Sequence, residues 1–199
     1  MNIFILSDST NYQEHISLQA QYHCDRHVVK MIAESTQLLV TALQPNSLLA
    51  VIPKAVGMSE VIDNLPCKPL AAGHANHPCA IWTRESAQHF QYLTDLALEL
   101  CYEHQARYPL SPRHQYMAWL EHLALTLNLA FSMADRKVPT HFAVAVADMP
   151  LLRSTGTPHQ EAVSHYRSYY YRQKRFFATW KRRPIPTWFL REQELAQDS

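Results

Sequence analysis

Residues 12–43 read YQEHISLQAQYHCDRHVVKMIAESTQLLVTAL and contain neither glycine nor proline. Apolar or small residues recur in this stretch every three or four positions, which is the spacing of one face of an α-helix. These positions are Ile16, Ala20, Cys24, Val28, Met31, Ser35, Leu38 and Ala42. The pattern predicts one long helix from about Tyr12 to Leu43, and we expect this helix at the centre of the fold.

The rest of the chain predicts further helices and few turns. The 199 residues include three glycines, whereas an all-β fold uses many for its tight turns. Proline suits the first turn of a helix. Prolines at 78, 112 and 158 therefore predict helices over residues 77–108, 111–132 and 157–181. We expect an all-α protein, residues 1–199 forming a single domain: a bundle of four main helices with extra short helices and long proline-containing loops.

Two stretches between these helices have no clear helical pattern. Residues 44–78 contain five prolines, although a short helix near 47–63 is an alternative. Residues 133–156 are irregular, and their apolar part at 142–147 fits either a strand or a short buried helix. The apolar run at 3–6 fits a strand or a packed arm, and we expect Trp188 and Phe189 to fold back and seal the core.

Composition and motifs exclude several classes of protein. No stretch reaches the roughly 18 apolar residues of a membrane span, and the first residues lack the basic region of a signal peptide. The four cysteines form no CxxC pair, so we expect a reduced, cytoplasmic setting. A zinc deaminase needs a second cysteine three positions after Cys79, where this chain has Trp82. Phosphate-binding P-loop, Rossmann and nucleophile-elbow motifs are absent from the sequence.

Positive charge gathers near the C-terminal end. Residues 165–191 contain eight Lys or Arg and no Asp or Glu, and aromatic residues interleave with them. Basic side chains neutralise phosphates and aromatic rings stack on bases, so this composition favours an anionic partner, a nucleotide or a nucleic acid. Arg167 and Lys174 are seven apart on one side of the predicted helix, and they are the preferred anion contacts, with Tyr170 beside them. Alternatively, the aromatic face is core and the charges only solvate the opposite side.

The densest polar cluster lies within the long predicted helix, at residues 23–30. His23 and His27 are four apart, a spacing at which two rings can share a helix face and bind a transition metal. The same residues could instead supply a general base, His27 or Asp25, beside Lys30 as an anion contact. The third alternative is two core histidines with satisfied hydrogen bonds.

A second cluster lies at the predicted helix start near Pro78. Asn76 and His77 precede the free N–H groups of the first turn, where an anion is favoured. Arg84 and Glu85 follow on the same helix, and Glu85 shares a face with His89. The alternative is a simple helix cap with loop histidines.

Several stretches resemble a family of uncharacterised helical proteins that is common in phage genomes and found in some bacteria. The matching pieces are MNIFIL at 1–6, HCDRHVVKMI at 23–32, HPCAIWTRES at 77–86, YRSYY at 166–170, WKRR at 180–183 and PTWF at 186–189. They touch both ends of the chain, so the resemblance is global, although residues 44–72 and 133–156 match nothing in the family. It implies a helical fold and, through the phage association, a role in DNA or nucleotide metabolism, but it names no reaction.

The leading hypothesis is an enzyme that acts on a nucleotide or on a base in DNA or RNA. Charged residues on apolar helix faces are costly to bury without partners, so we expect those of separate helices to converge on one pocket. Its catalytic residues would be Asp25, His27, His77 and Glu85. Its ligand- or phosphate-binding residues would be Lys30, Asn76, Arg84, Arg167, Tyr170 and Lys174. The alternatives are a non-catalytic nucleic-acid-binding protein that uses the basic C-terminal helix, and a metalloprotein with His23 and His27 as ligands. No motif identifies a cofactor.

Overall fold

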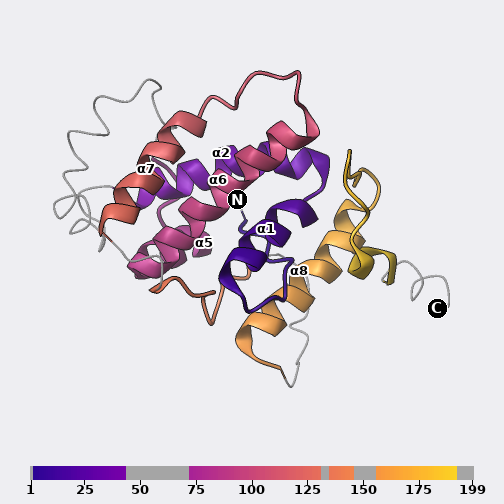
Figure 1. The fold of residues 1–199 in the computed structure, drawn as a ribbon. Helices are drawn as coiled ribbons and strands as arrows, with labels where there is room; N and C mark the ends of the chain where they lie inside the picture. The colour runs from indigo at the N-terminus through magenta and orange to yellow at the C-terminus, as the bar shows by residue number, and fades with distance from the viewer. Residues whose placement is uncertain (1, 44–71, 131–134, 146–155, 192–199) are drawn as a thin grey trace.

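The computed structural model describes residues 2–43, 72–130, 135–145 and 156–191. Within these ranges it contains helices and connecting segments but no β-strand, which confirms the all-α prediction. The helices are α1 (Tyr12–Tyr22), α2 (Asp25–Ala42), α5 (Pro78–Glu85), α6 (Ala87–Arg107), α7 (Met117–Ala130) and α8 (Pro158–Lys174). Helix α6 contacts α1, α2, α5 and α7, while α7 and α8 lie on opposite sides of the molecule in Figure 1. The short helix predicted near 47–63 lies outside the described residues.

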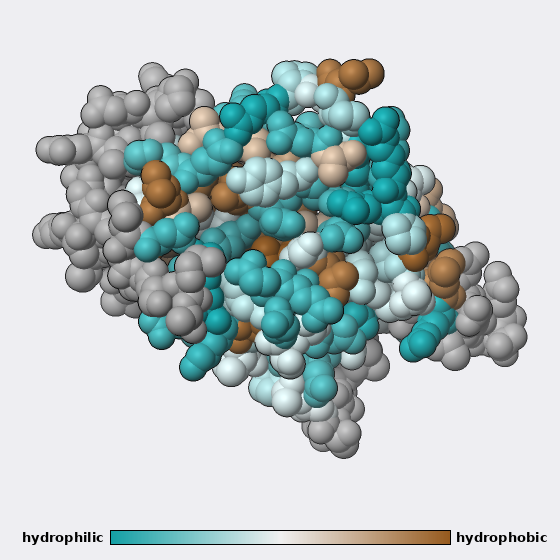
Figure 2. Space-filling view, in the orientation of Figure 1, coloured by the Kyte–Doolittle hydropathy of each residue, from teal (hydrophilic) through white to brown (hydrophobic). Residues whose placement is uncertain are grey.

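The core is apolar and rich in aromatic rings. Trp119, Tyr92 and Phe90 are among its largest fully buried side chains. Trp188 and Phe189 are each 7% exposed, which confirms that the segment after α8 folds back onto the core. On the face shown in Figure 2, polar residues dominate and hydrophobic residues are exposed in small, separate patches. None of the described helices has the length and hydropathy needed to cross a lipid bilayer.

The prediction of one continuous helix over residues 12–43 was wrong. The chain leaves the helical conformation at His23 and Cys24, whose ψ angles are 135° and 164°. At this break the backbone N–H of Cys24 donates to Tyr170 Oη (2.7 Å) and that of Asp25 to the carbonyl of Thr179 (2.8 Å). Because backbone N–H groups must be satisfied when buried, these tertiary partners replace two helical hydrogen bonds. The apolar periodicity of the sequence continues across the break, so the periodicity does not reveal where α1 ends and α2 begins.

The helix predicted over 77–108 also consists of two helices. It begins as expected, with His77 as the N-cap and Pro78 in the first turn, but it breaks at Ser86 (φ −151°, ψ 156°). The Ser86 hydroxyl accepts a hydrogen bond from the backbone N–H of His89 (3.0 Å) and thereby caps α6. Serine is a preferred N-cap because its side chain satisfies an N–H of the first turn.

The other two helix predictions were right about the helices and wrong about one boundary each. Helix α7 begins at Met117 rather than Ser111, because residues 112–114 are irregular and 115–116 form a turn. Helix α8 begins at the predicted capping box of Thr157 and Gln160. It ends at Lys174 rather than Lys181, since Thr179 and Lys181 are bound to Asp25 at the start of α2. In the irregular stretch near 142, residues 141–145 are neither strand nor helix, and Phe142 is buried.

An extended arm, residues 3–7, crosses the core beside α1. All five residues are buried. Gln19 of α1 holds the arm: its Oε1 accepts from the backbone N–H groups of Leu6 and Ser7 (both 2.8 Å), and its Nε2 donates to the carbonyl of Phe4. The structure therefore selects the packed arm over the strand for the apolar run at 3–6.

We expect Gln19→Leu to lower the free energy of unfolding by about 2–6 kcal/mol, because the two buried N–H groups left without an acceptor cost roughly 1–3 kcal/mol each. Urea unfolding followed by circular dichroism measures this. Gln21→Leu is the matched control on the same helix, since the Gln21 amide contacts the Ser17 hydroxyl at a half-buried position. Equal losses in the two variants would contradict the role of Gln19.

Candidate functional site

Asp25 lies in a structural ion network rather than in an open site. Its carboxylate accepts from Arg107 Nη1 (2.9 Å), Thr179 Oγ1 (2.8 Å) and the backbone N–H of Lys181 (2.9 Å to Oδ1 and 3.0 Å to Oδ2). Both oxygens are therefore occupied by donors that join α2, α6 and the segment after α8. A carboxylate so engaged is poorly placed to accept a proton from a ligand, which weakens the hypothesis that Asp25 is a general base.

Arg107 is the centre of this network, and it was not singled out from the sequence. Its side chain is fully buried and donates to Glu103 Oε1 (2.7 Å), to Asp25 and to the carbonyl of Gln21 (2.9 Å). Arg183 also binds Glu103, at 2.7 Å. The i, i+4 spacing of Glu103 and Arg107 was a signal for this pair, although nothing in the sequence indicated that both would be buried.

His23 and His27 do not share a helix, so the metal site predicted from their spacing loses its geometric basis. His23 is the C-cap of α1, and its Nδ1 lies 2.6 Å from the carbonyl of Gln19. Burial lowers the pKa of His23 to about 4, so its ring is neutral near pH 7 and packs within the core. Among the described residues, the one group of three close potential metal ligands lies elsewhere and includes neither ring.

His27 is buried in an aromatic cluster between the arm, α2 and α8. Its ring stacks on Phe4 (centroids 4.8 Å apart, 17°) and meets the edges of Tyr170 (5.0 Å) and Phe177 (5.9 Å). His27 Nδ1 is buried and has no hydrogen-bond partner among the described residues. Burial, helped by the charges of His23, Lys174 and Lys30, lowers the pKa of His27 to about 3. The ring is therefore a neutral, weakly basic group with one free nitrogen.

Exposed and half-buried cations surround this cluster. Arg26 lies over the ring of Phe177 (4.9 Å) and Lys174 over the half-buried ring of Tyr169 (5.0 Å). Arg175 lies 5.0 Å from the centre of the Phe176 ring. We call residues 26–30 together with 169–177 the basic junction, because the start of α2 meets the end of α8 here. The predicted residues His27, Lys30, Tyr170 and Lys174 all belong to it.

Tyr170 has a structural role within the basic junction. It is fully buried, and its hydroxyl accepts the backbone N–H of Cys24 at the break between α1 and α2. Burial raises its pKa well above the ordinary value, so the hydroxyl stays protonated. Tyr170 therefore joins α8 to the break between α1 and α2, and its buried side chain is not exposed to contact a ligand.

The start of α5 adjoins the basic junction through Glu34. Lys30 Nζ pairs with Glu34 (3.0 Å), and the negative charge of Glu34 also acts on the ring of His77. His77 Nδ1 accepts from the N–H of Cys79 (3.2 Å), as expected of a cap, and burial lowers the pKa of His77. Asn76 is exposed beside it. Arg84 donates to the carbonyl of Ala75 and so folds back over this turn.

Arg167 is held by the arm. Its Nε donates to the carbonyl of Leu6 (2.9 Å), its Nη2 pairs with Asp8 (3.1 Å), and its guanidinium lies over the ring of Trp188 (5.5 Å). These contacts join α8 to the N-terminal segment. The structure thus separates Arg167 from the basic junction, and an anion contact there would compete with Asp8.

Glu85 lies at the other end of α5, beside two histidines. Its Oε2 is 3.6 Å from His89 Nδ1 and 3.5 Å from His141 Nε2. His89 was noted on the same face as Glu85, but His141 lies in an irregular segment that gave no signal. These three are the close group of potential metal ligands among the described residues.

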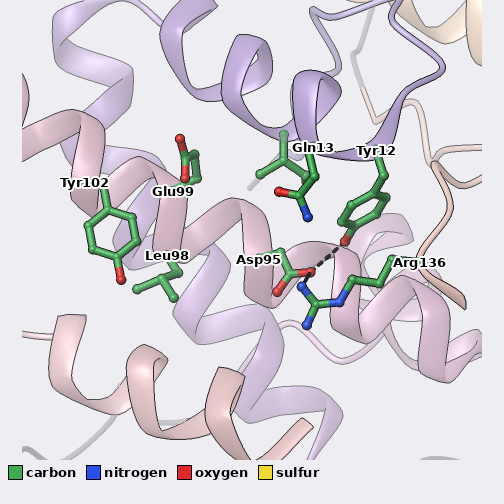
Figure 3. Close-up of a pocket in the computed structure, with 8 residues that line it drawn as sticks. Tyr12, Gln13, Asp95, Leu98, Glu99, Tyr102 and Arg136 are labelled. Atoms are coloured by element: carbon green, nitrogen blue, oxygen red, sulfur yellow. Dashed lines mark hydrogen bonds and ion pairs between the residues drawn. The ribbon is translucent and has the colours of Figure 1, made fainter. Parts of the chain in front are cut away.

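Two cavities lie away from all of these residues, where α1 approaches Arg136. In the smaller one, Asp95 accepts from Tyr12 Oη (2.7 Å) and pairs with Arg136 (3.1 Å), as Figure 3 shows. Its volume of about 120 Å³ is below the roughly 300–1,000 Å³ of small-molecule sites. The neighbouring cavity, about 500 Å³, has a mostly apolar wall whose charged members are Arg136 and Lys137. Arg136 is already held by Asp95, and neither cavity includes a site residue predicted from the sequence.

Comparisons with known proteins add no relative: no family model, curated protein or solved structure matches the chain. The placement and chemistry of the residues above are therefore what bears on function.

Proposed function

We propose that the protein binds a nucleotide or single-stranded nucleic acid at the basic junction. The observation that carries this proposal is Phe176, whose side chain is 80% exposed between Arg175 and Phe177 at the end of α8. An exposed aromatic ring among cations is the arrangement that stacks on bases while neighbouring charges bind phosphates. The flanking residues 165–191 contain no carboxylate that would repel such a ligand.

Three cations of the basic junction support this proposal because, unlike Lys30, they have no carboxylate partner among the described residues. No ion pair among the described residues involves Arg26, Lys174 or Arg175. Each instead lies over an aromatic ring, which holds the charge in place without neutralising it. Phosphates would supply the missing counter-charge.

We expect Phe176→Ala to weaken binding of a fluorescein-labelled 15-nucleotide poly(dT) strand by roughly 5- to 100-fold, since one base stacked on an aromatic residue contributes about 1–3 kcal/mol. Lys174→Ala should lower the affinity. It should also make the slope of log K against the logarithm of the salt concentration less steep, by about 0.7 for each phosphate that the variant no longer neutralises. Fluorescence anisotropy between 50 and 300 mM salt measures both effects.

Arg113→Ala is the matched control, since it removes one exposed positive charge beside α7 and leaves the basic junction intact. It should change affinity by less than twofold. Absence of binding at 50 mM salt and 100 μM protein would refute the proposal. Equal losses for Arg113→Ala and Lys174→Ala would replace it with non-specific attraction by net charge.

A second candidate is an enzyme that acts on the bound base, and the free Nδ1 of His27 favours it. A buried nitrogen without a partner among the described residues is unusual, and a polar group of the ligand would supply its hydrogen bond. With a pKa of about 3, His27 is too weak a base for efficient proton abstraction near pH 7, so it would polarise or orient the ligand instead. Mass spectrometry of oligonucleotides incubated with the protein tests this candidate; bases of unchanged mass and number after prolonged incubation would eliminate it.

A further inference from the structure

We infer that Glu85, His89 and His141 bind a divalent zinc-class metal ion. The three come from separate segments: the last residue of α5, the first turn of α6, and the irregular segment 135–145. Their potential ligand atoms all lie within 4.8 Å of one another. This site lies at the opposite end of α5 from the basic junction, and it differs from the His23–His27 pair expected from the sequence.

The spacing of the donors matches a coordination sphere. Ligand atoms bound tetrahedrally at roughly 2.0–2.1 Å from Zn²⁺ stand about 3.4 Å apart. Glu85 Oε2 is 3.5 Å from His141 Nε2 and 3.6 Å from His89 Nδ1. The chain therefore holds the carboxylate at nearly this separation from His141 Nε2 before any ion arrives, and it holds the His89 ring close to the same carboxylate oxygen.

Trp82 positions both histidines. Its carbonyl lies 2.8 Å from His89 Nδ1, and its indole stacks on the His89 ring with centroids 4.2 Å apart at 9°. Its indole Nε1 donates to the carbonyl of His141 (2.9 Å). A hydrogen bond from Nδ1 to a backbone carbonyl leaves the lone pair on Nε2, and this is the usual way that an outer residue orients a metal-binding histidine. We expect His89 to coordinate through Nε2.

The donor set and its exposure define the class of ion. Two imidazoles and one carboxylate suit Zn²⁺ and other late first-row divalent ions, whereas Ca²⁺ and Mg²⁺ prefer all-oxygen sites. The side chains of Glu85 and His141 are 45% and 58% exposed, while that of His89 is 7% exposed. Three protein ligands on the surface leave a coordination position for water, which is the arrangement of catalytic rather than structural zinc sites.

Isothermal titration of the full chain with ZnCl₂, after chelator treatment and dialysis, tests the inference. We expect one ion bound per chain with a dissociation constant in the micromolar range or tighter. His141→Ala and Glu85→Gln should each weaken binding at least tenfold. Both residues are exposed, so the variants should fold, and an unchanged thermal midpoint without metal verifies this.

His74→Ala is the matched control, because it removes another exposed histidine outside the site. It should leave stoichiometry and affinity unchanged. Three outcomes would overturn the inference: no heat of binding at 100 μM Zn²⁺, equal affinity in the His141→Ala variant, or a loss in His74→Ala as large as that in His141→Ala. The last result would indicate adventitious binding to surface histidines.

Discussion

Replacing Arg107 with methionine should lower the free energy of unfolding by about 3–5 kcal/mol, the usual cost of removing one partner from a buried ion pair. Arg107 is fully buried and holds Glu103, Asp25 and the carbonyl of Gln21 at once. Without it the Glu103 carboxylate, 3% exposed, retains Arg183 alone, and the backbone acceptor of Gln21 loses its donor. Urea unfolding at pH 7.5, followed by far-ultraviolet circular dichroism, measures the change.

Arg107→Lys is the control for charge. Lysine keeps the positive charge but loses the planar set of donors that reaches three acceptors, so we expect roughly half the loss of the methionine variant. A loss below 1 kcal/mol for Arg107→Met would show that the network does not hold α2, α6 and the C-terminal segment together.

Lowering the pH from 7 to 5 should destabilise the protein by roughly 5 kcal/mol. Burial lowers the pKa of His15 to about 4, of His23 to about 4 and of His27 to about 3, whereas unfolded histidine titrates near 6.5. The unfolded chain therefore binds more protons than the folded chain as the pH falls below 6.5. Stability is fully present above that value and is lost toward pH 4, by up to about 1.4 kcal/mol per pH unit for each ring.

His27→Leu isolates one of these rings. Leucine is of similar size, and His27 Nδ1 has no hydrogen bond to lose among the described residues. We expect the free energy of unfolding at pH 7.5 to lie within about 1.5 kcal/mol of that of the original chain. Between pH 6 and pH 5, the unfolding of the variant should take up about one proton fewer, so its free energy of unfolding should depend less on pH. Urea midpoints at pH 7, 6 and 5 measure both. A midpoint independent of pH in the unmodified chain would show that the rings titrate normally and are not buried neutral.

Local chemistry predicted three of the six starts of the described helices and failed at both internal breaks. The Thr157 capping box and the His77–Pro78 start are encoded within a few residues, so the sequence was sufficient for them. The break at Cys24 depends on Tyr170 and Thr179, about 150 residues away, and the Ser86 break sits in a sequence that also suits a helix interior. When the partners of a helix end are distant in the sequence, the residues next to that end carry no signal for it.

The candidate sites show the same difference between features encoded by nearby residues and features that depend on distant partners. His27, Lys30 and Lys174 were expected to converge because charged residues on apolar helix faces need partners, and in the structure both lysines lie near enough to His27 to lower its pKa. Arg167 and Asp25 were also predicted site residues, but each forms an ion pair inside the protein, with Asp8 and Arg107 respectively. The fold decides which charges become paired, so the sequence alone overestimated the number of predicted site residues without an internal ion pair. His141 could not be predicted because no periodic element carries it.

The buried arm has a consequence for synthesis on the ribosome. Residues 3–7 are translated about 150 residues before α8, yet His159 lies 3.1 Å from the carbonyl of Ser7 and Arg167 binds the carbonyl of Leu6. Helices α1 and α2 cover part of the arm, but its four consecutive apolar side chains are fully covered only after α8 has left the exit tunnel. Exposed apolar segments of this kind promote aggregation of nascent chains. The arm is expected to dock late, after translation of α8, and a slower rate of elongation would lengthen the interval during which chaperones can capture it.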